Sequence, residues 1–297
     1  MKKSAGYYFL RLLTWPMQLF PLEFHYGLSD FLFFIVYHLT GYRKQVVHQN
    51  LCNAFPDKEE EEIIKIEKDF FRGFCDMFIE TLYFTHINIK KESKRLKIEN
   101  IECLTQQVDQ HKNAIVVAGH FGNWEFMQLF AEKLGTDVYF IYKKLNNKVF
   151  DSFYRDLRSR AAQPLEMKET PRVLLSKSNH PFVSYFISDQ RPIPEEIKHW
   201  VHFMNQETPV MLGTEKIATK TNAAVIYLEV KRIKRGYHQA TFTLMTENAS
   251  ALPQYAITKQ FFNMLEQSIN NSPDQYFWTH KRWKYKRDDF KGRDTLS

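Results

Sequence analysis

His120 and Glu125 are the residues of this sequence whose types and spacing best fit catalysis. Residues 114–125 read AIVVAGHFGNWE, an apolar run followed by a histidine and, five positions later, a glutamate. A carboxylate in the first turn of a helix can fold back toward the imidazole and orient it as a general base. Such a base would take the proton of an alcohol that attacks an acyl thioester, so that no covalent enzyme nucleophile is needed. A histidine after a strand is more often structural, so the pattern gains its meaning from its context.

Two glycines flank the histidine. Gly119 and Gly122 allow the backbone to turn tightly and to approach a ligand, and a helix that starts at Asn123 or Trp124 offers free amide groups to an anion. We therefore expect Gly122 and Asn123 to bind substrate beside the catalytic pair.

Several catalytic motifs are absent from the sequence. None of the ten glycines belongs to a GxSxG, GxGxxG or GxxxxGK[ST] motif, and HExxH does not occur. These absences exclude the nucleophile elbow of esterases, a dinucleotide fingerprint and a nucleotide-hydrolysing phosphate loop. Cys52, Cys75 and Cys103 are widely spaced and form no metal-binding pattern, which indicates structural cysteines in a reducing compartment. We expect no metal and no organic cofactor.

Short apolar runs alternate with amphipathic segments, which predicts an α/β fold with a mostly parallel central sheet flanked by helices. The expected strands are Ala114 to Ala118, Val138 to Tyr142, Phe182 to Ile187, Ala224 to Val230 and Gln239 to Thr246. The expected helices are Pro56 to about His86, Trp124 to Leu134, Lys148 to Arg160, Pro171 to Lys177, Leu212 to Thr221 and Gln254 to Asn271. Open α/β folds bind ligands at the carboxyl ends of their strands, where His120 would lie.

Residues 1–44 are expected to form a separate helical segment that anchors the chain in a membrane. Their apolar runs, Leu12 to Leu22 and Phe31 to Tyr37, are separated by charged and polar residues, and two prolines break the first run. A helix that spans a bilayer needs about 20 mainly apolar residues. We therefore favour an interfacial or re-entrant anchor over a single clean span, with buried helices of a soluble domain as the alternative.

The composition fits contact with apolar material and with anions. Aromatic residues make up 15% of the 297 residues, and the net charge is +7. Phospholipid headgroups, an acidic carrier protein and nucleic acid would all be attracted to such a surface. Between His280 and Arg287, five basic residues alternate with aromatic ones. For this segment we favour lipid phosphates over nucleic acid.

The string GHFGNWE, residues 119–125, and its surroundings resemble the lipid A secondary acyltransferases, the lauroyl and myristoyl transferases of Gram-negative envelopes. The resemblance covers nearly the whole chain. Residues 41–56 are similar to the segment after the family's membrane anchor, Asn146-Asn147 with Asp151, Arg158 and Arg160 to its second block, Asp189-Gln190 to its third, and residues 273–284 to its C-terminal signature. Residues 142–145 and 191–202 depart from the commoner pattern, so the resemblance says less about the acceptor than about the reaction type.

The resemblance implies that residues 45–297 form an acyltransferase domain with His120 as the base and Glu125 as its partner. The implied donor is an acyl-carrier-protein thioester. The implied acceptor is a hydroxyl group on an acyl chain of a phosphorylated glycolipid, a lipid A precursor. The implied location is the cytoplasmic face of the cell inner membrane.

Five further polar residues are candidates for substrate binding. We expect Arg158 to contact a phosphate or the thioester carbonyl, with Arg160 secondary; a surface salt bridge is the alternative. Asp189 and Gln190 follow an apolar strand and should face the site from the carboxyl edge of the sheet, with structural capping as the alternative. Asn146 belongs to the same block as the arginines and is expected to bind substrate as well.

Three other functions stay open from the sequence alone. An acyltransferase of the same fold would act on a lysophospholipid, an aminolipid or a mannosylated phosphoinositide. A catalytically silent basic protein would bind a membrane surface or nucleic acid, and His120→Ala would leave its function intact. A hydrolase would use the same base to activate water.

Overall fold

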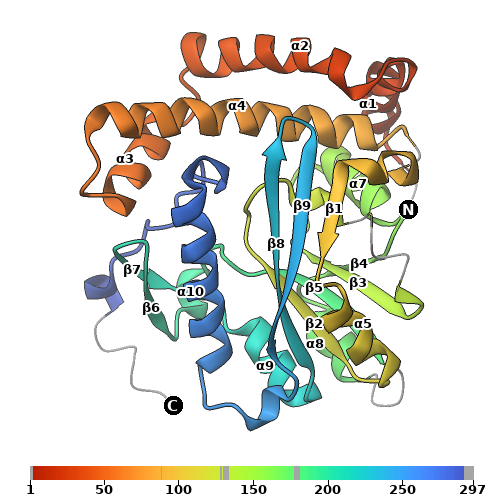
Figure 1. Ribbon diagram of the computed structural model, residues 1–297, viewed down its shortest axis with the longest axis vertical. Coiled ribbons are helices and arrows are strands. Elements are labelled where there is room, and N and C mark those ends of the chain that lie inside the picture. Colours follow the sequence, from red (N-terminus) through yellow and green to blue (C-terminus); the bar gives the residue numbers. More distant parts are fainter. Residues whose placement is uncertain (1–2, 88, 128, 130–133, 177–180, 291–297) are drawn as a thin grey trace.

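A seven-stranded sheet forms the centre of the fold in a computed structural model that describes residues 3–87, 89–127, 129, 134–176 and 181–290 (Figure 1). The strand order is β1-β9-β8-β2-β5-β3-β4, and in this described sheet all neighbours are parallel except β8 and β9. The strands are β1 (Leu96–Glu99), β2 (Ala114–Ala118), β3 (Asp137–Tyr142), β4 (Gln163–Glu166), β5 (Phe182–Ile187), β8 (Ala224–Lys234) and β9 (Tyr237–Thr246); β6 (Trp200–Phe203) and β7 (Gln206–Pro209) form a separate hairpin. The predicted mostly parallel α/β fold is confirmed.

Helices cover both faces of the sheet because its central strands are apolar on both sides. The helices are α1 (Ala5–Thr14), α2 (Leu22–Phe33), α3 (Lys44–Ala54), α4 (Glu60–Phe84), α5 (Glu102–Asp109), α7 (Lys148–Arg158), α8 (Thr170–Leu175), α9 (Gly213–Thr221) and α10 (Ala256–Asn271). Alternate residues of β2 enter two different cores: Ile115 and Val117 pack with α9 and α10, whereas Val116 packs with α5 and α7. The long helix α4 contributes to both cores.

The five predicted strands are all present within a few residues of their expected bounds. The sequence did not predict the hairpin of β6 and β7 or, within the sheet, β1 and β4. Both are four-residue strands at the two edges of the sheet, and an edge strand buries too little surface to need an apolar run. The predicted helix from Trp124 begins as a short 3₁₀ turn, Trp124–Met127, and much of the rest of it lies outside the described residues.

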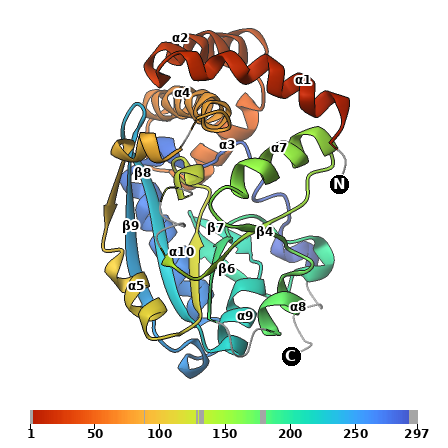
Figure 2. The same ribbon diagram turned by 90° about the vertical axis from the view of Figure 1, so that its right-hand side faces the viewer.

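An N-terminal helical layer, residues 5–39, lies against α4 at one end of the molecule, opposite α8 and α9 (Figures 1 and 2). Helix α2 has an unusual distribution of side chains. Its buried positions include the polar residues His25, Tyr26 and Ser29, whereas Phe24 and Phe31 on its other side are 65% and 60% exposed. Among the described residues, no helix combines the length and the apolar character needed to cross a membrane.

The loop after β2 is held by the C-terminal part of the chain. The amide of Gly122 donates to the carbonyl of Gln275 at 2.8 Å, and the amide of Phe277 donates to the carbonyl of His120 at 3.0 Å. Gly122 has a φ of +60°, and a Cβ atom at this position would lie 1.8 Å from the carbonyl oxygen of Val230 in β8. The loop is thus clamped between β8 and the C-terminal segment.

Replacing Gly122 by alanine should lower the free energy of unfolding by at least about 2 kcal/mol, because the new methyl group forces either a strained backbone or a displaced strand. Urea unfolding measures this loss. The matched control is Gly213→Ala, where a Cβ atom meets nothing within 4 Å. A Gly122→Ala variant as stable as Gly213→Ala would contradict the close approach to β8.

Candidate functional site

The sheet brings His120 and Asp189 together at its carboxyl edge. In the pairing of β2 with β5, Ala118 lies opposite Ile187, so the residues two positions further along each chain become neighbours. One carboxylate oxygen of Asp189 accepts hydrogen bonds from the main-chain amide of His120 at 3.1 Å and from its ring Nδ1 at 2.6 Å. The same carboxylate therefore orients both the backbone and the imidazole.

The contacts of His120 define which ring nitrogen is available for chemistry. Nδ1 faces the Asp189 carboxylate, which can only accept, so this nitrogen carries the proton and Nε2 is left with its lone pair. The side-chain amide of Gln190 lies 3.2 Å from Nε2. Burial would raise the pKa of Asp189, but the charge of His120 and the hydrogen bond with it outweigh burial and hold that pKa below its ordinary value. Asp189 thus stays ionised as the partner of the imidazole.

The carboxylate at the imidazole Nδ1 is therefore Asp189, and not Glu125 as expected. The buried carboxylate of Glu125 instead accepts from the guanidinium of Arg158 through Nη2 at 2.5 Å and through Nε at 3.3 Å. Residue spacing favoured Glu125 because it lies near in sequence, whereas the pairing of β2 with β5 provides a carboxylate that is 69 residues away. Arg158, expected to bind a phosphate or a carbonyl, forms this ion pair with Glu125.

Asn123 is locked in place between two partners. Its side-chain oxygen accepts from the amide of Glu125 at 3.1 Å, and its side-chain nitrogen donates to the carboxylate of Glu80 in α4 at 2.6 Å. Both Asn123 and Glu80 are buried. Burial raises the pKa of Glu80 to about 7, although the hydrogen bonds from Asn123 and Tyr26 oppose the rise. The loop that carries Glu125 is thus supported from α4 by a carboxyl group that titrates near neutral pH.

The other predicted substrate-binding residues lie in different surroundings. Asn146 is exposed in the loop that follows β3, at the same carboxyl edge as His120. Arg160 donates to the carbonyls of Phe84, Thr85 and Ile87 at the end of α4, where a cation also complements the helix dipole. The structure thus brings Asp189 and Gln190 to His120, pairs Arg158 with Glu125, and leaves Arg160 with a structural contact.

Aromatic rings border the imidazole. Trp124 meets His120 edge-to-face with ring centroids 4.7 Å apart, and Phe277 lies 5.9 Å from His120 and 5.6 Å from Trp124. Phe74 of α4 continues the series at 5.9 Å from Phe277. A narrow pocket beside the loop is lined by these aromatic residues together with polar and charged side chains, among them Asp76, Glu80, Asn123 and Arg232. The aromatic rings limit the access of water to the imidazole.

The C-terminal basic segment does not present all of its charges to the surface. Arg282, predicted to face lipid phosphates, is 1% exposed and donates to the carbonyl of Pro209 at 2.7 Å. Burial lowers its pKa to about 10. Its positive charge acts on Asp189, whose pKa it helps to lower. Arg282 therefore belongs to the interior behind the site.

A group of possible metal ligands lies on α3 and at the start of α4. His48, Cys52 and Glu60 have ligand atoms within 4.8 Å of one another. None of these three residues contacts His120 or Asp189 through a described interaction. The geometry around His120 itself consists of a histidine, a carboxylate and an amide, the set needed for proton transfer.

Comparison with known proteins identifies a match over almost the whole chain. Residues 2–285 match the model of the family described as bacterial lipid A biosynthesis acyltransferase. The chain is 21% identical over 248 residues to the lipid A biosynthesis palmitoleoyltransferase of Escherichia coli strain K12, covering 82% of this chain and 79% of that protein. The lipid A biosynthesis acyltransferase of Shigella flexneri matches with the same identity and coverage.

Glu80 should make the protein less stable as the pH rises from about 4.5 to about 7. In this interval the unfolded chain has released the proton of this carboxyl group, whereas the folded protein retains it. The contribution of Glu80 to the free energy of unfolding therefore falls by up to about 3 kcal/mol. Chemical unfolding at several pH values, for wild type and for Glu80→Gln, measures the difference. The wild-type profile should decline more steeply; two profiles of equal slope would contradict a raised pKa.

Proposed function

The chain belongs to the bacterial lipid A biosynthesis acyltransferase family and is an O-acyltransferase, and we propose that it uses His120 as a general base. In this proposal the base activates a hydroxyl group on an acyl chain of the lipid A precursor. The acyl donor is an acyl-carrier-protein thioester, in keeping with the net charge of +7, which attracts an acidic carrier.

The contact that carries the proposal is the 2.6 Å hydrogen bond between His120 and Asp189, because it keeps the lone pair on Nε2. The acceptor hydroxyl approaches Nε2 in place of the Gln190 amide, gives up its proton, and its oxygen attacks the thioester carbonyl. The new C–O bond forms, the C–S bond breaks, and the proton passes from His120 to the leaving thiolate. Each atom and charge is accounted for without a covalent enzyme intermediate.

The two carboxylates of the site have different roles in this mechanism. Asp189 stabilises the imidazolium that forms during transfer, because it is ionised and directly bonded to the ring. Glu125, although expected to be the partner of the histidine, acts through Arg158, whose guanidinium it holds beside the loop.

The remaining polar residues are assigned to substrate binding. Gln190 is close enough to Nε2 to donate to a substrate oxygen, and exposed Asn146 is assigned to the polar part of the acceptor. Among the described residues, the Nη1 group of Arg158 makes no hydrogen bond, and we assign it to a phosphate or the thioester carbonyl. For Arg160 and Gly122, substrate binding stays a prediction.

Replacement of His120 by alanine should lower kcat by about a hundredfold or more, in line with the loss of general-base assistance. Asp189→Asn should lower kcat by a similar factor, and Glu125→Gln by a smaller one, because Asp189 bonds to the imidazole whereas Glu125 pairs with Arg158. The assay measures transfer of a labelled acyl group from acyl carrier protein to a phosphorylated lipid A precursor. All variants are first shown to be folded by circular dichroism. A larger loss in Glu125→Gln than in Asp189→Asn would return the orienting role to Glu125.

We further propose that the N-terminal layer lies in the cytoplasmic leaflet of the inner membrane. Its outward side chains are large and apolar, with Leu12 72% and Phe9 68% exposed, whereas α2 turns polar side chains inward. This arrangement is unfavourable in water and favourable at a lipid surface. It also brings the active site close to a substrate that resides in the membrane.

A Leu12→Glu, Phe24→Glu double variant should bind phospholipid vesicles at least about tenfold more weakly than wild type, since burying each side chain in lipid contributes about 1.5–3 kcal/mol. Flotation with vesicles of phosphatidylethanolamine and phosphatidylglycerol measures the bound fraction. Leu175→Glu in α8 is the control, because this exposed leucine lies at the opposite end of the molecule (Figure 1). Equal losses in both proteins would argue against the layer as the lipid-binding surface.

A further inference from the structure

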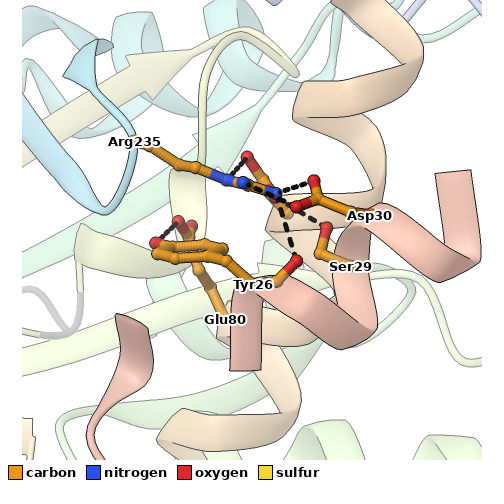
Figure 3. Close-up of polar contacts among 6 residues, drawn as sticks. Tyr26, Ser29, Asp30, Glu80 and Arg235 are labelled. Atoms are coloured by element: carbon orange, nitrogen blue, oxygen red, sulfur yellow. Dashed lines mark hydrogen bonds and ion pairs between the residues drawn. The ribbon is translucent and has the colours of Figure 1, made fainter. Parts of the chain in front are cut away.

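The inner side of α2 is joined to the body of the protein by two groups of polar contacts. Figure 3 shows the first, in which the guanidinium of Arg235, at the turn between β8 and β9, bonds to Asp30 of α2 at 2.5 Å and to Asp76 of α4 at 2.7 Å. Ser29 donates to the same Asp76 carboxylate at 2.6 Å. One arginine therefore connects α2, α4 and the β8–β9 turn.

The second group leads from α2 into the catalytic loop. The hydroxyl of Tyr26 donates to one carboxylate oxygen of Glu80 at 2.8 Å, and the side-chain nitrogen of Asn123 donates to the other oxygen at 2.6 Å (Figure 3 shows Tyr26 and Glu80). All three residues are buried. Asn123 in turn accepts from the amide of Glu125. A continuous hydrogen-bonded chain thus runs from the N-terminal layer to the loop that contains His120.

We infer that Glu80 is a positioning residue for acyl transfer, which sets the catalytic loop by tying Asn123 to Tyr26 on the lipid-facing helix α2. The inference rests on the proposed function in that residues 119–125 carry out the transfer. Glu80 touches neither substrate nor the reacting atoms in this scheme; it acts through Asn123. Contact of α2 with lipid is thereby linked to the geometry of the active site.

The physical basis is the cost of breaking a buried polar chain. Asn123 and Tyr26 each use one oxygen of Glu80, and a buried polar group left without its partner is destabilised because no hydrogen bond replaces its lost contact with water. The loop would move to recover those contacts, and a shift of about 1 Å in a reacting group lowers the rate by about a hundredfold. A side chain that retains both hydrogen bonds should therefore preserve the rate.

The test compares three replacements of matched kind. Glu80→Leu fills the same space without hydrogen bonds, and Glu80→Gln can still accept from Asn123 and donate to the Tyr26 oxygen. Glu67→Leu is the control: Glu67 is a buried carboxylate of the same helix that accepts from Tyr37 of the N-terminal layer at 2.8 Å, 13 residues and about 20 Å away along α4. Tyr26→Phe and Tyr37→Phe form a second matched pair that removes a single hydroxyl from each contact.

Glu80→Leu should lower kcat about 10- to 100-fold with KM for donor and acceptor changed less than about threefold, because the loop moves while the binding surfaces remain. Glu80→Gln should stay within about threefold of wild type, and Glu67→Leu likewise. Tyr26→Phe should lower kcat about three- to tenfold and Tyr37→Phe should not. The inference is overturned if Glu80→Leu and Glu67→Leu lose activity alike, if Glu80→Leu changes KM alone, or if both tyrosine variants behave alike.

Amide hydrogen exchange supplies a readout that does not depend on the choice of substrates. Peptides covering residues 119–127 should exchange at least about tenfold faster in Glu80→Leu than in wild type, and unchanged in Glu67→Leu. Unchanged exchange in Glu80→Leu would overturn the inference even if the enzyme were active. A wild type that fails to use acyl carrier protein, or a fully active His120→Ala, would refute the proposed donor or base while leaving this exchange comparison valid.

Discussion

The candidate site depends on the register between β2 and β5. Because Ala118 pairs with Ile187, the chain brings Asp189 to His120, and one carboxylate oxygen bonds to both the amide and the imidazole of that residue. Side chains in a strand alternate between the two faces of the sheet, so a slip of one residue would exchange the two cores and separate the pair. The apolar residues of β2 that pack into two cores therefore also align His120 with Asp189.

The C-terminal segment supports the loop from the other side. Its backbone bonds to His120 and Gly122, and its own carbonyls are held by the N-terminal part of the chain. Asn50 of α3 donates to the carbonyl of Trp278 at 2.8 Å, and Arg43 donates to that of Thr279 at 3.0 Å. Segments more than 200 residues apart in sequence thus enclose one short loop. A basic, aromatic C-terminus that reads as a surface motif therefore contributes buried groups, of which Arg282 is the clearest case.

Helix α2 connects the exposed apolar surface of the N-terminal layer to the loop that contains His120. A helix with buried polar and exposed apolar residues has no advantage in water, since the usual arrangement is the reverse. At a lipid surface the exposed rings are buried, while Tyr26 and Ser29 still meet partners within the protein. The helix thus presents apolar side chains outward and polar ones inward, and Glu80 joins it to the loop through hydrogen bonds with Tyr26 and Asn123.

Local patterns in the sequence were sufficient for the α/β fold, for five of the seven strands of the sheet and for His120 at a carboxyl edge, because apolar periodicity and glycine placement act over a few residues. The family resemblance was also carried by short motifs and is confirmed by the match over residues 2–285. The partner of the histidine could not be predicted from local patterns: Glu125 is close in sequence, but strand order and register bring Asp189 to His120 instead. Local patterns also did not predict the edge strands, the buried position of Arg282 or the hydrogen-bonded chain from Tyr26 to Asn123. Each of these depends on contacts between distant segments, whose pairing follows from how the whole core packs and leaves no periodic signal in the residues themselves.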